Sequence, residues 1–94
     1  MKVKLVFIQE FYKIIGRFEV EADLEEGATV LDAIRYVDER VHKGFKDLVL
    51  DDGEVKYPVE IAVNGRRIDF LDGLHTKLNE GDTVLFSPRA LFIV

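Results

Sequence analysis

The fold is decided by the stretch Thr29-Val30-Leu31-Asp32-Ala33-Ile34-Arg35-Tyr36-Val37, because it predicts the one long amphipathic helix of the chain. Thr29 offers an N-cap oxygen, and Asp32, three residues later, supplies a weaker version of the capping box. The apolar residues at helical spacing form one stripe, and they are Val30, Ala33, Ile34, Val37 and Val41. We expect this helix to end near His42 and to cover one face of a sheet.

Two alternating segments before the helix predict a hairpin. Residues 2–9 point Val3, Leu5 and Phe7 to one side. Residues 17–24 alternate throughout, and their predicted inward side chains are Phe18, Val20, Ala22 and Leu24. Residues 11–16 are interpreted as a connection between these strands.

Further strands follow the helix. Residues 45–50 carry apolar side chains without a clear period, so we expect an irregular segment. Val59, Ile61 and Val63 alternate in a third strand, and Asn64-Gly65 is a strong tight-turn signal. A short strand is expected within residues 66–71 and a final strand over 83–87. The sequence therefore predicts an α+β fold with a mixed four- to five-stranded sheet packed on one main helix. We expect one domain over residues 1–94, in which 88–94 form an apolar C-terminal tail.

Composition excludes several kinds of protein. The chain has 94 residues, 48% of them hydrophobic, a net charge of -5 and no cysteine. Disulfides, zinc–thiolate sites and thiol nucleophiles are therefore excluded. Negative charge disfavours nucleic acid as a partner, and no apolar run approaches the ~20 residues of a membrane span. We expect a cytoplasmic protein with neither a nucleic-acid nor a membrane partner. One third of the residues are charged, which is typical of thermophiles.

Candidate catalytic and metal-binding residues do not form a pattern. His42 and His75 are far apart and lack ligand partners at metal spacing. The acidic run Asp51-Asp52-Gly53 lacks the spacing of a calcium loop and indicates a turn. We predict no catalytic residue, no cofactor and no metal, so the protein is not an enzyme by itself.

Several short motifs together resemble the MoaD/ThiS sulfur carriers, which include the small subunit of molybdopterin synthase. These motifs are Glu25-Glu26-Gly27-Ala28-Thr29-Val30, Val63-Asn64-Gly65, Leu71-Asp72-Gly73-Leu74 and Glu80-Gly81-Asp82-Thr83-Val84. The resemblance implies a ubiquitin-like β-grasp, with the first and last strands side by side in the sheet centre. It also implies a carrier whose terminal glycine is adenylated by a partner enzyme and converted to a thiocarboxylate.

The resemblance breaks at positions that such carriers show to their partners. Phe92 and Ile93 stand where the family has its glycine pair, which must thread a narrow channel. The family's Arg-Glu pair before the first loop glycine is Tyr12-Lys13 here, and Ser87 replaces a surface aromatic residue. We therefore expect an interaction module that has lost the thiocarboxylate-forming end, with a working sulfur carrier of molybdenum, tungsten or thiamine cofactor synthesis as the alternative.

Partner binding, or self-association, is expected at the open sheet face and the tail. With the strand order that the resemblance implies, the outer face should gather Val6, Ile8, Ala62 and Leu85. Full burial of each apolar tail residue stabilises the ordered state by ~1.5–3 kcal/mol. Ordering the backbone of that residue costs roughly 1–2 kcal/mol in conformational entropy. The tail should thus be ordered against its own sheet, a second copy or a partner. The predicted partner-binding residues are Val6, Ile8, Leu85, Arg89, Leu91, Phe92, Ile93 and Val94.

Overall fold

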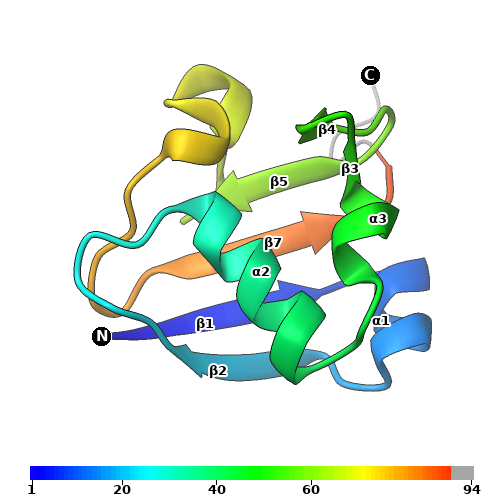
Figure 1. Ribbon diagram of the computed structural model, residues 1–94, viewed down its shortest axis with the longest axis horizontal. Coiled ribbons are helices and arrows are strands. Elements are labelled where there is room, and N and C mark those ends of the chain that lie inside the picture. The colour runs from blue at the N-terminus through cyan, green and yellow to red at the C-terminus, as the bar shows by residue number, and fades with distance from the viewer. Residues whose placement is uncertain (90–94) are drawn as a thin grey trace.

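The computed structural model describes residues 1–89, and its main element is a five-stranded mixed sheet in the order β2-β1-β7-β5-β6 (Figure 1). The strands are β1 (Lys2–Phe7), β2 (Glu19–Asp23), β5 (Glu60–Val63), β6 (Arg66–Arg67) and β7 (Thr83–Ser87). β1 runs parallel to β7 in the sheet centre, whereas the other neighbours are antiparallel. This arrangement confirms the predicted α+β, ubiquitin-like β-grasp.

One face of the sheet is covered by helices. They are α1 (Glu10–Ile15), α2 (Val30–Arg40) and α3 (Phe45–Val49), with two 3₁₀ turns, η1 (Ile68–Phe70) and η2 (Gly73–His75). Figure 1 shows α2 crossing this face, α3 following beside it, and α1 at the end of the sheet where β1 finishes. A second, two-stranded sheet pairs β3 (Leu50–Asp51) with β4 (Glu54–Val55).

The main helix begins at the predicted cap. The amide of Asp32 donates to Thr29 Oγ1 at 3.4 Å, and the amide of Thr29 donates to Asp32 Oδ2 at 2.9 Å. This reciprocal capping box satisfies two backbone donors that the first helical turn leaves unpaired. The predicted apolar stripe is buried from Val30 to Val37, and the helix ends at Arg40, close to the expected end at His42.

Three phenylalanines fill the core between the sheet centre and α3. Phe7 and Phe86, neighbours on β1 and β7, stack with ring centroids 5.5 Å apart. Phe45 meets both rings edge-on, at 5.7 Å from Phe7 and 5.2 Å from Phe86. All three side chains have no exposed area. The parallel pair of strands is therefore fixed from the helix side by an aromatic cluster.

The Asn64-Gly65 turn is tied to the last strand. Both residues have positive φ, 51° and 83°, as expected for the tight hairpin turn predicted there. The Asn64 side-chain oxygen accepts from the Thr83 amide at 3.0 Å, and its amide nitrogen donates to Asp82 Oδ1 at 2.9 Å. This side chain thus sets the position of the β5–β6 hairpin relative to the start of β7.

Three predictions were wrong in detail. Residues 10–15 form helix α1, not an irregular connection, and residues 45–49 form helix α3. The strand predicted over 17–24 is shorter. It begins only at Glu19, the first of its residues that is paired with β1, where the partner is Val6. Phe18 therefore lies beyond the strand and is 55% exposed instead of inward-facing. The short strand expected within 66–71 is confirmed as β6, which ends at Arg67 and gives way to η1.

Candidate partner-binding surface

The outer face of the sheet, opposite α2, carries one row of side chains that crosses all five strands. The register aligns Glu19 of β2, Val6 of β1, Leu85 of β7, Ala62 of β5 and Arg67 of β6, and we call these five residues the outer row. Successive residues of a strand point to opposite faces, so the core residues Leu5, Val84 and Phe86 lie behind this row. The register therefore places the predicted Val6, Ala62 and Leu85 together.

Exposure differs sharply along the outer row. Val6 is 9% exposed and Ala62 only 1%, so neither offers much apolar surface. Leu85 is half-buried, and so is Ile8, just after β1, whose amide donates to the Phe86 carbonyl at 3.3 Å. Leu85 and Ile8 thus supply the accessible apolar part of the predicted patch.

The charged residues at both ends of the outer row form ion pairs. Glu19 pairs with Lys4 at 3.1 Å on the β2 side. Arg67 lies 3.5 Å from Glu60 and 2.8 Å from Asp69 on the β6 side, and its guanidinium stands 5.5 Å from the Phe70 ring. The face is therefore an apolar centre with a charged rim, the usual anatomy of a protein interface.

Arg89, a predicted site residue, reaches back to the start of α1. Its Nε donates to Gln9 Oε1 at 3.0 Å, and its Nη2 donates to both carboxylate oxygens of Glu10, with 2.6 Å to Oε1. Hydrogen bonding from Arg89 holds the pKa of the Glu10 carboxyl below its ordinary value of 4.5, with a smaller contribution from the charge of Lys13. These hydrogen bonds therefore hold Arg89, the last described residue, beside the start of α1.

Ser87 is not a surface residue. It is fully buried, and its hydroxyl donates to the backbone carbonyl of Arg89. Sequence reasoning placed this residue on the surface because the resemblance puts an aromatic side chain there. In this protein the position instead shapes the backbone turn that brings Arg89 towards α1.

A second apolar surface, which the sequence prediction missed, lies beside Ile8. We call it the α1 groove, a hollow of about 400 Å³ lined by Ile8, Gln9, Tyr12, Lys13 and Phe18. Tyr12 is 48% exposed, and its ring meets Phe18 edge-on at 6.4 Å. The available signal was Tyr12-Lys13 itself, which departs from the family pair. Ile8 makes the groove continuous with the outer face.

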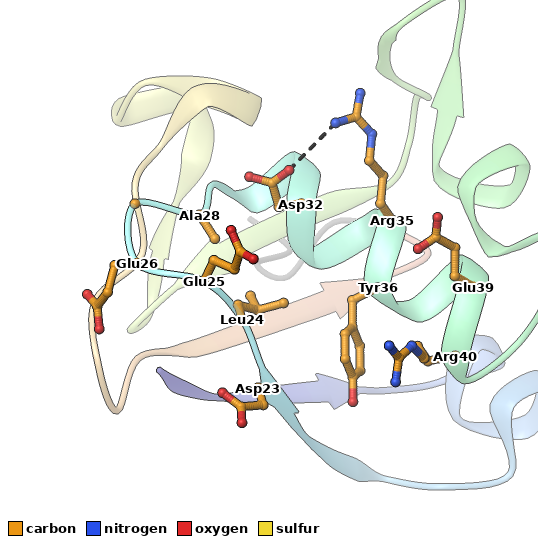
Figure 2. Close-up of a pocket in the computed structure, with 11 residues that line it drawn as sticks. Asp23, Leu24, Glu25, Glu26, Ala28, Asp32, Arg35, Tyr36, Glu39 and Arg40 are labelled. Atoms are coloured by element: carbon orange, nitrogen blue, oxygen red, sulfur yellow. Dashed lines mark ion pairs between the residues drawn. The ribbon is translucent and has the colours of Figure 1, made fainter.

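A larger hollow lies elsewhere, between the β2–α2 connection and α2 (Figure 2). It measures about 500 Å³ and is rich in carboxylates. Figure 2 shows Asp32 and Arg35 facing each other, at 3.6 Å, and Arg40 beside the Tyr36 ring, at 6.0 Å from its centre. These two contacts join lining side chains of one helix, as expected for a solvated helix face.

The remaining predictions concern chemistry and the tail. Within residues 1–89, no group of three or more His, Asp or Glu side chains is placed to hold a metal ion. No helix of this described part has the length and apolar character needed to cross a membrane. The predicted tail contacts lie outside the described residues, and they are Leu91, Phe92, Ile93 and Val94.

Comparison with known proteins gives a consistent result. A family model described as the ThiS family matches residues 5–88. Small archaeal modifier protein 3 of Haloferax volcanii is 35% identical over 91 residues, which cover 96% of this chain and 98% of that protein. A putative molybdopterin converting factor, subunit 1, from Pyrococcus furiosus has a TM-score of 0.77 at 36% identity, over 95% of this chain and 98% of that one. A chain of the Amycolatopsis orientalis BexX/CysO complex has a TM-score of 0.81 at 26% identity, over 96% and 98%.

Proposed function

Because this chain belongs to the ThiS family of ubiquitin-like sulfur-carrier domains, we propose that it is a non-catalytic module that binds a partner protein through the outer face of its sheet. Proteins of this family are not catalysts themselves and act by conjugation to, or in complex with, partner proteins. The CysO structure is one such complex, with BexX. The partner of this chain is, in our proposal, the adenylating enzyme that the family resemblance implies.

The observation that carries this proposal is the outer row with half-buried Leu85 at its centre. An apolar side chain on a central strand, between two charged ends, fits a small interface whose core excludes water. Ile8 extends the apolar part along β1, and Arg89 borders it. We include the apolar residues Leu91, Phe92, Ile93 and Val94 in the proposed surface.

We further propose that the thiocarboxylate-forming end is lost. Phe92 and Ile93 occupy the positions that the resemblance gives to the glycine pair. A glycine pair can enter a narrow active-site channel because it has no Cβ, whereas a phenyl ring and a β-branched side chain need much more width. Binding of the enzyme would then persist without transfer of sulfur.

Binding is tested by calorimetry with the purified adenylating enzyme of the same organism. We expect a complex with the full chain and at least tenfold weaker binding for Leu85→Glu, because a carboxylate would be desolvated at the interface centre. Tyr57→Glu adds the same charge at a 93% exposed position off the outer row and should bind normally. Ile8→Glu repeats the test without altering a central strand. Equal binding by all variants would reject the outer face.

A working sulfur carrier is the second candidate, and the match over residues 5–88 favours it because nearly the whole family body is retained. The two candidates differ in chemistry. Incubation with the enzyme and ATP, read by intact mass, should leave the chain unmodified under our proposal. A chain carrying an adenylate, or a carboxyl oxygen exchanged for sulfur, would establish the carrier and refute the lost end. The same mass measurement on protein isolated from its own cells provides an independent check.

A further inference from the structure

The α1 groove has a cationic side chain, Lys13, and no acidic side chain in its lining. Both acids beside it already have cationic partners, since Glu10 is bound by Arg89 and Glu19 by Lys4. Lys13, which lines the groove, and Arg17, next to Phe18 in the sequence, are exposed and form no ion pair within residues 1–89. The groove is therefore an apolar hollow that has one cation, Lys13, in its lining and a second, Arg17, next to its Phe18 in the sequence.

This pattern stands out because the chain as a whole carries a net charge of -5. The larger hollow in Figure 2 has the opposite character, and its lining carboxylates are Asp23, Glu25, Glu26, Asp32 and Glu39. A second copy is a poor occupant of the α1 groove, because two chains of the same net charge repel each other at long range. A contact between the groove of one copy and the acidic hollow of the next would also be head-to-tail and would not close into a dimer.

We propose that the α1 groove binds an apolar segment of the partner protein that carries acidic side chains. This inference rests on the proposed function and names the chemistry of its partner. Apolar side chains of the segment pack on Ile8, Tyr12 and Phe18, and its carboxylates pair with Lys13 and Arg17. Exposed aromatic rings suit such a role, because they bury a large area at low entropic cost and dominate many interfaces.

The segment chemistry is tested with two probe peptides on the nitrogen-15-labelled full chain. Both have 12 residues with the same leucines and phenylalanines, and the remaining positions are all glutamate in one and all lysine in the other. We expect the acidic peptide to bind at least tenfold more tightly and to shift the amide signals of Gln9, Tyr12, Lys13 and Phe18. The preference should shrink as salt rises, because exposed charges are screened.

Variants separate the apolar from the charged contribution. The double variant Lys13→Glu, Arg17→Glu should reverse the preference between the two peptides. The double variant Lys43→Glu, Lys46→Glu changes the net charge equally at exposed positions near α3 and should leave the preference intact. Phe18→Ser should weaken both peptides, since it removes apolar contact without altering charge.

Three results would overturn the inference: equal affinity for the two peptides, signal shifts confined to the acidic hollow, or a preference unchanged by reversal at Lys13 and Arg17. Concentration-dependent self-association abolished by Phe18→Ser would assign the groove to a second copy and would also refute it. Measuring how variants bind the adenylating enzyme distinguishes the groove inference from the proposed function at the outer face. If Leu85→Glu weakens that binding and charge reversal in the groove does not, the proposed function stands and the groove is rejected.

Discussion

The guanidinium of Arg89 lies 2.6 Å from the carboxylate of Glu10, and this contact joins residues 79 positions apart in the sequence. Both side chains are substantially exposed, at 60% and 46%, so the pair contributes little to stability. Its effect is positional, because it holds Arg89 beside the start of α1. The two surfaces discussed above therefore meet at the point where the described chain ends.

Removing the arginine should change how Glu10 titrates. The pKa of Glu10 is lowered in the folded chain, so the contact stabilises the fold above the ordinary pKa of 4.5 and is lost as pH falls through the lowered value. Arg89→Ala should raise the pKa towards 4.5, as measured by the side-chain carboxyl carbon-13 shift. Lys13→Ala should raise it less, since the charge of Lys13 is the smaller cause. An identical titration curve in Arg89→Ala would contradict the contact.

The aromatic cluster should dominate the stability of the sheet centre. Phe45→Ala removes a fully buried ring that meets Phe7 and Phe86, and we expect a loss of about 3–5 kcal/mol in urea unfolding. A double-mutant cycle of Phe45→Leu with Phe86→Leu should give a coupling of about 0.5–1.5 kcal/mol. Phe70→Ala, at a 75% exposed position, is the control and should cost under about 1 kcal/mol. A comparable loss in the control would refute this assignment.

The side chain of Asn64 should matter more than its backbone conformation. Asn64→Ala loses the hydrogen bonds to Thr83 and Asp82 and places alanine at positive φ, so we expect a cost of about 1–3 kcal/mol. Asn64→Gly relieves the backbone but still lacks both bonds. If urea unfolding shows that the glycine variant regains wild-type stability, the tie to β7 contributes nothing.

The capping box should make Thr29 sensitive to loss of its hydroxyl. Thr29→Ala removes the oxygen that accepts from the Asp32 amide and should cost about 1–2 kcal/mol. Thr29→Ser keeps the oxygen and should retain most of the stability. Thermal unfolding followed by circular dichroism at 222 nm measures both. Equal losses in the two variants would assign the effect to the Thr29 methyl group instead.

The elements with repeated patterns were predictable from the sequence. The Thr29 cap and its apolar stripe predicted α2 to within two residues of its C-terminal end, and the alternation in 83–87 predicted β7. Helices α1 and α3 were missed because they have six and five residues, too few to show a helical period. Only Phe11 is buried in α1, so its sequence carries no stripe.

The site was predictable where it depends on strand register. Alternation along β1 and β7, combined with the strand order that the resemblance implies, correctly placed Val6 and Leu85 on the same face. Alternation misassigned Phe18, because a run of alternating residues does not reveal where a strand loses its neighbour. The α1 groove could not be predicted, since it arises from Phe18 meeting a helix that the sequence does not show.

The parallel pairing of β1 with β7 has a consequence for synthesis in the cell. The ribosome makes β1 well before β7, so β1 keeps an unpaired edge until β7 has been synthesised. Long-range pairing of this kind is slow to form because its loop entropy must be overcome first. A chain stopped before residue 83 would leave the edge of β1 that pairs with β7 without its partner strand. Incomplete products would therefore carry an unpaired strand edge, which is prone to pair with other chains.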